Sequence, residues 1–280
     1  MTGRVETFAW NPRTSLNLPF VRRFALGPRK NNFGDLVGPM VVELVRERLG
    51  LSPHSRSGDP VRLFSVGSVL HFADDGDVVW GSGVNGKIPS DRYRWSTLDV
   101  RAVRGPLTRQ WVSDRTGEQA PAVYGDPALL LFELGFDRPP REASREVLYV
   151  PNLNDLGRPV PTGHVVSPRS PLRQVLAEIA ASEAVVTSSL HALVFAEMLG
   201  VPVALIKPSA ESSFKYEDYA RGTGRDELPM FADFASALAH ASTSRHRHED
   251  ALAGWSSAPL LAAFPADVFV PSIARTAGGA

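Results

Sequence analysis

Apolar and polar positions alternate along this chain in blocks that predict the strands and helices of a parallel-sheet protein. The clearest block covers residues 183–206: an apolar strand at 184–187, a Ser-Ser turn, a helix that opens on Leu190 and His191, and a second apolar strand after Gly200. A buried strand, a helix that ends at glycine and a second buried strand are typical of a βαβ unit. Ligands of such units lie where a strand passes into its helix, and His191 occupies this position.

Similar blocks cover most of the remaining chain. Further strands are predicted at residues 5–10, 62–66, 77–80, 97–103, 147–151 and 164–166. Further helices are predicted between Asp35 and Gly50, between Pro106 and Gly117, and at residues 170–181, 232–241 and 249–264. The stretch 136–145 is polar, rich in proline and without periodicity, which indicates a domain linker. We therefore predict an α/β chain with two Rossmann-like domains, at residues 1–135 and 146–280, whose mostly parallel sheets face each other across a cleft.

Composition narrows the possible function classes. The chain has 280 residues, of which 43% are hydrophobic, enough for one large or two modest domains. Its 30 basic and 30 acidic residues give a formal net charge of zero, so no basic field attracts nucleic acid or anionic lipid. The absence of cysteine excludes disulfides, thiolate zinc sites and thiol nucleophiles. No apolar signal core or bilayer-length apolar run is present, so we expect a cytosolic enzyme.

An asparagine and an aspartate precede the first long predicted helix, in the sequence Asn32-Phe33-Gly34-Asp35. Aspartate is a preferred N-cap residue, and this structural role is the simpler interpretation of Asp35. The functional alternative is a general base, because a carboxylate at the edge of a cleft can take a proton from a sugar hydroxyl. Asn32 would then orient the same hydroxyl.

Two other features follow predicted strands. The loop at residues 81–86, Gly-Ser-Gly-Val-Asn-Gly, contains Gly83 and could turn its N–H groups toward a phosphate. It lacks a known phosphate-loop pattern, so a tight turn after a strand is an equally good interpretation. Arg104 ends a strand directly before Gly-Pro, where a side chain can point into the cleft. Its guanidinium suits a carboxylate or a phosphate, although most single arginines are simply solvated.

His191 taken alone is most simply interpreted as a histidine packed in a helix. Ser188 and Ser189 favour a functional role. Two hydroxyls at a helix N-terminus after a buried strand form an anion site, and a bound anion would stabilise an imidazolium. Because histidine has an ordinary pKa near ~6.5, it is a natural acid for chemistry at neutral pH.

Three further polar groups carry weaker signals. Lys215 is one of only four lysines in the chain. It is four residues before Tyr219, so in a helix the two side chains share one face and could bind a phosphate together. The alternative interpretation is an ordinary amphipathic turn. Asp126, in Gly-Asp-Pro, is interpreted as a helix cap. A role in a hinge or in a contact at the rim of the cleft stays open as the alternative. The run at residues 246–250, His-Arg-His-Glu-Asp, is more typical of a solvated loop than of a metal site. We predict no metal site.

These motifs together resemble the polysaccharide pyruvyl transferase family. Between residues 32 and 219 they are N-F-G-D, the Gly-Ser-Gly loop, V-R-G-P-L-T-R, G-D-P-A-L-L-L, S-S-L-H with the following helix and strand, and K-Y-E-D-Y. The resemblance implies a GT-B-like fold. It also implies an enzyme that transfers pyruvate from phosphoenolpyruvate to a sugar diol and forms a cyclic ketal, without a cofactor. It implies that His191 is the acid and contacts phosphoenolpyruvate, that Asp35 is the base, and that Arg104 contacts an anion. The N-terminal domain would bind the sugar or glycan acceptor, free or lipid-linked, and the C-terminal domain the donor.

One position departs from the family pattern. Many relatives place an arginine two residues before the histidine, where this chain has Ser189. Lys215, Arg221 and Arg101 are the candidates for supplying the missing charge. Two alternative functions stay open: a GT-B-like glycosyltransferase that uses a nucleotide sugar, and a non-catalytic glycan-binding protein of the same fold. We expect a cytoplasmic location, either free or at the inner face of the membrane.

Overall fold

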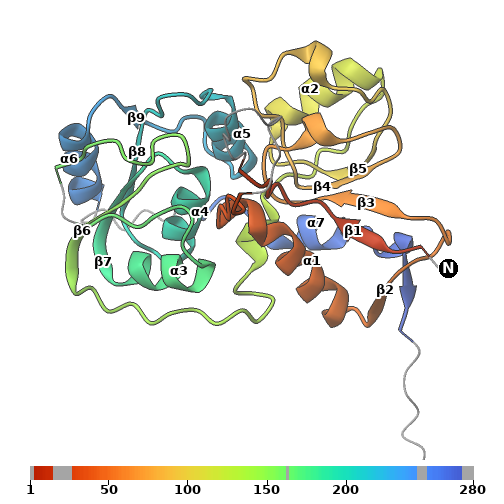
Figure 1. Cartoon of the computed structure of the whole chain (residues 1–280), viewed down its shortest axis with the longest axis horizontal. Helices are drawn as coiled ribbons and strands as arrows, with labels where there is room; N and C mark the ends of the chain where they lie inside the picture. The colour runs from red at the N-terminus through yellow and green to blue at the C-terminus, as the bar shows by residue number, and fades with distance from the viewer. Residues whose placement is uncertain (1–2, 15–26, 162–163, 245–250, 273–280) are drawn as a thin grey trace, which may run out of the picture.

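Two four-stranded parallel sheets form the framework of the structure (Figure 1). The computed structural model describes residues 3–14, 27–161, 164–244 and 251–272. Within these ranges, the first sheet has the order β1 (Val5–Thr7), β3 (Val61–Phe64), β4 (Val78–Trp80) and β5 (Asp99–Ala102), and the second has the order β6 (Arg145–Val150), β7 (Ser182–Thr187), β8 (Val203–Ile206) and β9 (Met230–Phe231). All pairs within these two sheets are parallel, which confirms the predicted α/β class with mostly parallel sheets.

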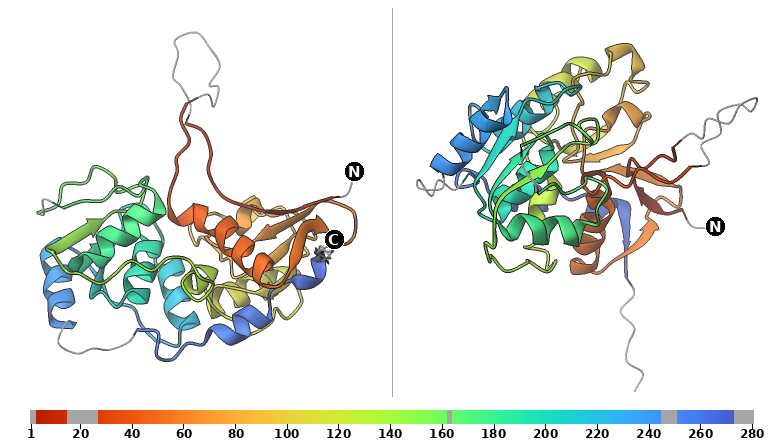
Figure 2. Two further views of the ribbon diagram at one scale, coloured as in Figure 1. Left: turned by 90° about the horizontal axis from the view of Figure 1, so that it is seen from below. Right: turned by 60° about the vertical axis from the view of Figure 1, so that its left-hand side comes forward.

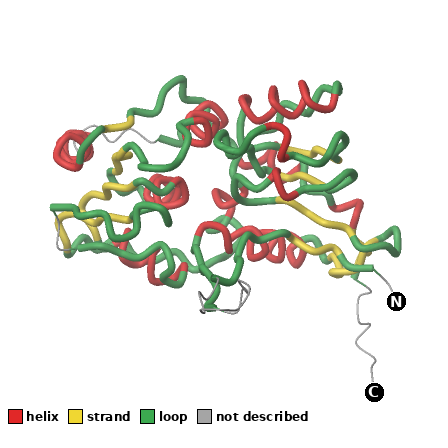
Figure 3. The backbone as a smooth tube through the Cα atoms, turned by 45° about the horizontal axis from the view of Figure 1, so that its top comes forward, coloured by secondary structure: helices red, strands yellow, loops and turns green. Residues whose placement is uncertain are grey.

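Helices cover the sheets and connect their strands (Figure 3). They are α1 (Val37–Arg48), α2 (Pro106–Thr116), α3 (Leu172–Ala180), α4 (Leu190–Met198), α5 (Phe214–Gly222), α6 (Phe234–Ser244) and α7 (Ser257–Ala262). Short 3₁₀ turns occur at η1 (Gly34–Leu36), η2 (Leu70–Phe72), η3 (Ser90–Arg92), η4 (Pro127–Leu130) and η5 (Ala266–Val268). None of the helices in the described ranges is long and apolar enough to cross a membrane.

The predicted strand-turn-helix-strand unit of residues 183–206 is confirmed as β7, α4 and β8. Residues 190–196 of α4 are all buried, as expected for a helix that is apolar on every side. The helix begins after Ser189, whose Oγ accepts a hydrogen bond from the N–H of Ala192 at 3.5 Å. This cap fixes the first turn of α4, and therefore His191, at the carboxyl end of β7.

One hydrophobic core continues between the two sheets. Phe33, directly before η1, and Phe195 in α4 are both buried, and their ring centroids are 6.1 Å apart. The turn η4 packs against both α1 and α4, so apolar residues of the N-terminal and C-terminal halves belong to the same cluster. The two halves therefore share a core, and the start of α1 lies against the start of α4.

The end of the described chain returns to the N-terminal half (Figures 1 and 2). Strand β10 (Phe269–Pro271) pairs with β2 (Leu51–Ser55) in an antiparallel two-stranded sheet. The indole Nε1 of Trp80 donates a hydrogen bond to the carbonyl of Leu260 in α7 at 2.8 Å. The division into domains at residues 136–145 stays a prediction, but the segment from α7 to β10 packs on the half that contains β3 and β4.

The structure differs from the expected elements at several short segments. The predicted strand at residues 164–166 forms only an isolated bridge between Tyr149 and Val165. The predicted helix at residues 249–264 is confirmed only from Ser257 to Ala262, and a turn at residues 251–254, which contains Gly254, precedes it. Helix α5 and strands β2, β9 and β10 were not predicted. Pro53 in β2 and Pro271 in β10 lower the strand signal, because proline is confined to sheet edges.

Candidate functional site

A cavity of about 370 Å³ opens where strands of both parallel sheets end. Its apolar wall consists of Trp10, Val69, Phe72, Ile88, Leu153 and Leu190. Its polar lining consists of Lys30, Asn32, Asp35, Ser68, His71, Asn85, Lys87, Asn152, Asn154, Ser189, His191, Glu211 and Lys215. Three of the chain's four lysines are in this lining. The carboxyl ends of parallel strands are the usual place for a ligand, and this cavity is the candidate site.

His191 reaches the cavity from the first turn of α4, and the buried carboxylate of Asp126 lies beside its ring. Its Nε2 lies 3.5 Å from Oδ2 of Asp126, and both atoms are buried without a hydrogen-bond partner within the described structure. The other oxygen of Asp126 accepts a hydrogen bond from the N–H of Ala128 at 3.0 Å and caps η4. Asp126 therefore has the predicted capping role, and its Oδ2 atom lies within ion-pair distance of His191.

Gly34 places the first helix of the N-terminal half directly against this histidine. A Cβ atom added at Gly34 would lie 2.1 Å from Nδ1 of His191, a distance that no real side chain tolerates. Glycine is therefore the residue that permits this close approach. The same approach brings Asp35, the next residue, to the cavity beside His191.

Asp35 does not act as a helix cap. Neither η1 nor α1 has a side-chain cap, and Oδ2 of Asp35 instead accepts a hydrogen bond from Nδ2 of Asn32 at 2.8 Å. Burial raises the pKa of Asp35 above its ordinary value, although His191, the Asn32 amide and Lys215 act in the opposite direction. A carboxylate with a raised pKa binds a proton more readily, which suits a general base.

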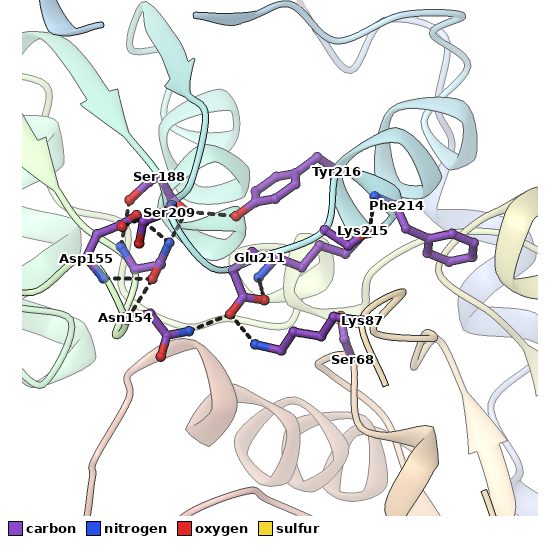
Figure 4. A network of polar contacts seen from close by, with 12 residues as sticks. Ser68, Lys87, Asn154, Asp155, Ser188, Ser209, Glu211, Phe214, Lys215 and Tyr216 are labelled. Carbon is purple, nitrogen blue, oxygen red and sulfur yellow. Dashed lines mark hydrogen bonds and ion pairs between the residues drawn. The ribbon is translucent and has the colours of Figure 1, made fainter. Parts of the chain in front are cut away.

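Four residues that follow three different strands form a charged network in the lining of the same cavity (Figure 4). The Oε1 atom of Glu211 accepts hydrogen bonds from Nζ of Lys87 at 2.5 Å and from Nδ2 of Asn154 at 2.6 Å. Its Oε2 atom accepts one from Nζ of Lys215 at 2.9 Å. Burial lowers the pKa of Lys215, although Glu211 acts in the opposite direction. Lys215, a predicted substrate contact, thus lines the cavity together with an unpredicted lysine.

The two serines before α4 have different positions. Ser189 lines the cavity and caps α4. Ser188 is fully buried behind it: its Oγ accepts a hydrogen bond from the N–H of Asn152 at 3.0 Å, and its carbonyl accepts one from the Tyr216 hydroxyl at 2.8 Å. Ser188 therefore supports the loop that carries Asn152, and only Ser189 can contact a ligand in this arrangement.

Arg104 lies outside the cavity lining and is fully buried. Its Nε lies 3.0 Å from Oδ2 of Asp218 in α5, its Nη1 donates to Ser68 Oγ at 2.5 Å, and its Nη2 donates to the Val84 carbonyl at 2.9 Å. A Cβ atom at Gly83 would lie 2.4 Å from the guanidinium carbon, so this glycine accommodates the arginine. The placement favours a structural role for Arg104 and Gly83 over the predicted anion and substrate contacts.

The remaining predicted candidates also lie away from the cavity. Arg101 forms ion pairs with Asp99 and Asp267. The hydroxyl of the buried Tyr219 donates a hydrogen bond to the carboxylate of Glu197. Arg221 is exposed and does not line the cavity. Over the residues that the structure describes, no group of three potential metal ligands is present. The run at residues 246–250 lies outside the described residues.

Several residues of the cavity were not identified from the sequence. Lys87, Asn154 and Glu211 belong to loops, and His71 to the short turn η2, and none of them stands in a recognisable motif. The scarcity of lysine was the available signal, since it applies to Lys87 as much as to Lys215. The contact of Asp126 with His191 had no local signal, because 65 residues separate the two positions in the chain.

Comparison with known proteins identifies the chain's relatives. The family model described as polysaccharide pyruvyl transferase matches residues 54–209. The chain belongs to this family. The matched range contains Lys87, Asp126, Asn154 and His191, whereas Asp35, Glu211 and Lys215 lie outside it.

Individual relatives are distant. The succinoglycan biosynthesis protein ExoV of Rhizobium meliloti is 29% identical over an alignment of 180 residues. The match covers 58% of this chain and 54% of ExoV, so the chain spans about half the length of that relative. An uncharacterized protein of Acanthamoeba polyphaga mimivirus is 25% identical over an alignment of 233 residues, and the match covers 76% of each chain. A crystal structure of a functionally uncharacterized protein of Klebsiella pneumoniae has a TM-score of 0.51 at 13% identity, covering 82% of this chain and 93% of the other. The last similarity concerns the fold alone.

Proposed function

We propose that this chain transfers pyruvate from phosphoenolpyruvate onto two hydroxyls of a sugar, in a polysaccharide or its precursor, and forms a cyclic ketal. The observation that carries the proposal is the placement of Asp35 and His191 side by side in one cavity with three lysines. An acid, a base and several cations are what this reaction needs. Membership of the pyruvyl transferase family and the similarity to a succinoglycan biosynthesis protein support a polysaccharide acceptor.

The proposed chemistry uses two proton transfers at the cavity. His191, as the imidazolium, protonates the methylene carbon of phosphoenolpyruvate, which makes the central carbon electrophilic and converts the methylene to a methyl group. Asp35 takes the proton of the first sugar hydroxyl as its oxygen bonds to that carbon. The carbon–oxygen bond to phosphate then breaks, and the second hydroxyl closes the ketal ring. Of the two hydroxyl protons, one restores the imidazolium of His191, which gave its proton to the methyl group, and the other leaves with phosphate.

The surroundings of each group suit these roles. The carboxylate of Asp126 behind His191 offsets the charge of an imidazolium and fixes the ring. Asn32 orients the carboxylate of Asp35 through its hydrogen bond at 2.8 Å. Lys87 and Lys215 provide positive charge for the phosphate and carboxylate of the donor, in place of the arginine that is expected at Ser189.

The wider organisation follows from the same proposal. We propose that the two sheets are the halves of a GT-B-like arrangement, with the acceptor on the side of β3 and β4 and the donor on the side of β7 and β8. The donor needs no cofactor or metal ion in this scheme, because the lysines supply the charge. Since phosphoenolpyruvate is a cytosolic metabolite, the proposed reaction takes place in the cytoplasm.

The test is incubation of the purified chain with phosphoenolpyruvate and candidate glycans, following phosphate release and the mass of the ketal product. We expect turnover that depends on both substrates and that falls by about 10²- to 10⁴-fold in His191→Ala, because the general acid is lost. The matched control is His54→Ala, since His54 is exposed on β2 and outside the cavity. Undiminished turnover in His191→Ala, or turnover with a nucleotide sugar instead of phosphoenolpyruvate, would contradict the proposal.

A further inference from the structure

Two of the three lysines in the cavity lining, Lys87 and Lys215, contact the carboxylate of Glu211. Three nitrogen donors approach it within 3 Å: the ammonium groups of Lys87 and Lys215 and the amide of Asn154 (Figure 4). The side chain of Glu211 is only 6% exposed, whereas that of Lys87 is 36% exposed. A buried carboxylate thus occupies the most cationic part of a cavity that otherwise opens to solvent.

Glu211 is ionised at neutral pH. Burial would raise the pKa of Glu211, but Lys215 and Lys87 together hold it below its ordinary value. The two lysines therefore share one internal counter-ion, and the group keeps a net positive charge. Any external anion that enters this part of the cavity competes with Glu211 for the same donors.

The donors are positioned by the backbone rather than by Glu211 alone. Asn154 follows β6, Lys215 lies at the start of α5 after β8, and Lys87 follows β4 in the other sheet. Gly86 has a φ of 76° and approaches so closely that an added Cβ would lie 2.4 Å from Cβ of Phe214. This contact holds the loop of Lys87 against α5, so that the two lysines face each other from opposite halves of the molecule.

We propose that Lys87, Lys215 and Asn154 form the binding site for the phosphate of the donor, and that Glu211 is an internal anion which occupies this site until phosphate displaces it. Ammonium groups suit phosphate as point charges, and two of them match the charge of a phosphate dianion. The inference rests on the proposed function, because it assigns the group of phosphoenolpyruvate that these three residues bind. It also supplies positive charge in a chain that has Ser189 where the family resemblance predicts an arginine.

The test is titration of the purified chain with inorganic phosphate by calorimetry, which requires no turnover. Glu211→Gln removes the competing charge but keeps the size of the side chain. We expect it to bind phosphate about tenfold more tightly, because a negative charge a few Å from a bound anion costs at least about 1.4 kcal/mol in a partly buried site. Lys87→Met and Lys215→Met should each bind phosphate about tenfold more weakly than the unchanged chain.

The matched control is Glu217→Gln, which changes the net charge equally on the same segment but lies outside the cavity. It should leave phosphate binding unchanged. Pyruvate, which has a carboxylate and no phosphate, is titrated in parallel and should not show the gain in Glu211→Gln. If Glu211→Gln does not fold, Glu211→Asp, which is too short to reach both lysines, should show a smaller gain of the same sign.

The outcomes separate the two hypotheses. Equal or weaker phosphate binding in a folded Glu211→Gln, or a gain with pyruvate but not with phosphate, would overturn the assignment. If phosphate binding follows the expected pattern while phosphoenolpyruvate is not consumed, the phosphate site stands and the proposed pyruvyl transfer fails. If transfer occurs and the Glu211 variants bind phosphate like the unchanged chain, only the present inference fails.

Discussion

At the scale of single residues, the site depends on two side chains whose simpler interpretations were structural. Asp35 could have been a helix cap and His191 a packed histidine, yet the structure gives Asp35 no capping contact and places both side chains at one cavity. Because Gly34 has no side chain, the backbone of η1 can pack directly against the ring of His191. The glycine thereby determines how Asp35 and His191 lie relative to each other.

Replacement of Asp35 by asparagine should separate activity from stability. The pKa of Asp35 is raised in the folded chain, so its contribution to the free energy of unfolding is present at low pH and is lost as pH rises through this raised pKa. Asparagine stays neutral and can keep the contact with Asn32. We expect Asp35→Asn to lower turnover by about 10²- to 10⁴-fold while unfolding at a higher denaturant concentration at pH 7.

The measurements are urea unfolding at pH 7 and pH 4, and turnover of phosphoenolpyruvate across the same range. The stability gain should shrink at the lower pH, where Asp35 itself takes up a proton. In the unchanged chain, kcat/KM should fall on the acidic side as Asp35 is protonated. A variant that is both less stable than the unchanged chain and fully active would contradict the assignment of Asp35 as the general base.

At the scale of elements, the contact between η1, which leads into α1, and the first turn of α4 places Asp35 beside His191. We expect Gly34→Ala to lower kcat by at least about tenfold, because a displacement of about 1 Å at a reacting group is enough for a loss of that order. The new Cβ would lie 2.1 Å from Nδ1 of His191, so the ring or the backbone must move. The measurement is steady-state kinetics together with a thermal melt.

Gly254→Ala is the matched control for this substitution. Gly254 has no left-handed φ, and a Cβ there would meet nothing closer than the Thr223 carbonyl at 3.7 Å. It should leave both activity and stability close to those of the unchanged chain. Full activity in Gly34→Ala would show that the approach of the two helices is not needed for the reaction.

Local sequence patterns predicted the elements whose ends are marked by special residues. Helix α2 begins at Pro106 and ends before Gly117, which has a φ of 74°, as expected for this pair of residues. Helix α5 was missed although Tyr216, Tyr219 and Ala220 form a buried face, because charged residues between them resemble a polar loop. Short edge strands such as β9, with two residues, have too little periodicity to be predicted.

The candidate site was predicted in part for the same reason. Asn32, Asp35, Ser189, His191 and Lys215 line the cavity as expected, since each stands at the junction of a strand or loop with a helix. Arg104 occupies a similar junction but turns to Asp218, which is 114 residues away in the chain. A strand-end arginine can face a ligand or a buried carboxylate, and only the tertiary structure shows which partner is present.

At the scale of the whole molecule, three connections hold the two sheets in position around the cavity. The shared apolar core is one, and the return of α7 and β10 to the N-terminal half is another. The third is the pair of Arg104 and Asp218, which are 1% and 0% exposed and join the end of β5 to α5. Since Arg104 also contacts Ser68 in the cavity lining, the pair links the stability of the molecule to the shape of the site.

Loss of Asp218 should therefore destabilise the chain strongly. Its carboxylate also accepts hydrogen bonds from the backbone N–H and the hydroxyl of Thr108 at 2.9 and 2.6 Å. Asp218→Ala leaves the Arg104 charge buried without its counter-ion, for which we expect a loss of about 3–5 kcal/mol in the free energy of unfolding. Asp137→Ala, which breaks the exposed pair of Asp137 and Arg173, should cost less than about 1 kcal/mol.

Urea unfolding of both variants measures this difference, and a double variant identifies its cause. If the cost comes from an unpaired buried charge, Arg104→Met combined with Asp218→Leu should be more stable than Asp218→Ala alone, because neither residue then carries a charge. Phosphate binding should weaken in the double variant even so, since Ser68 and the loop that leads to Lys87 lose the guanidinium that holds them. A double variant as unstable as Asp218→Ala would instead assign the cost to the lost hydrogen bonds of Thr108.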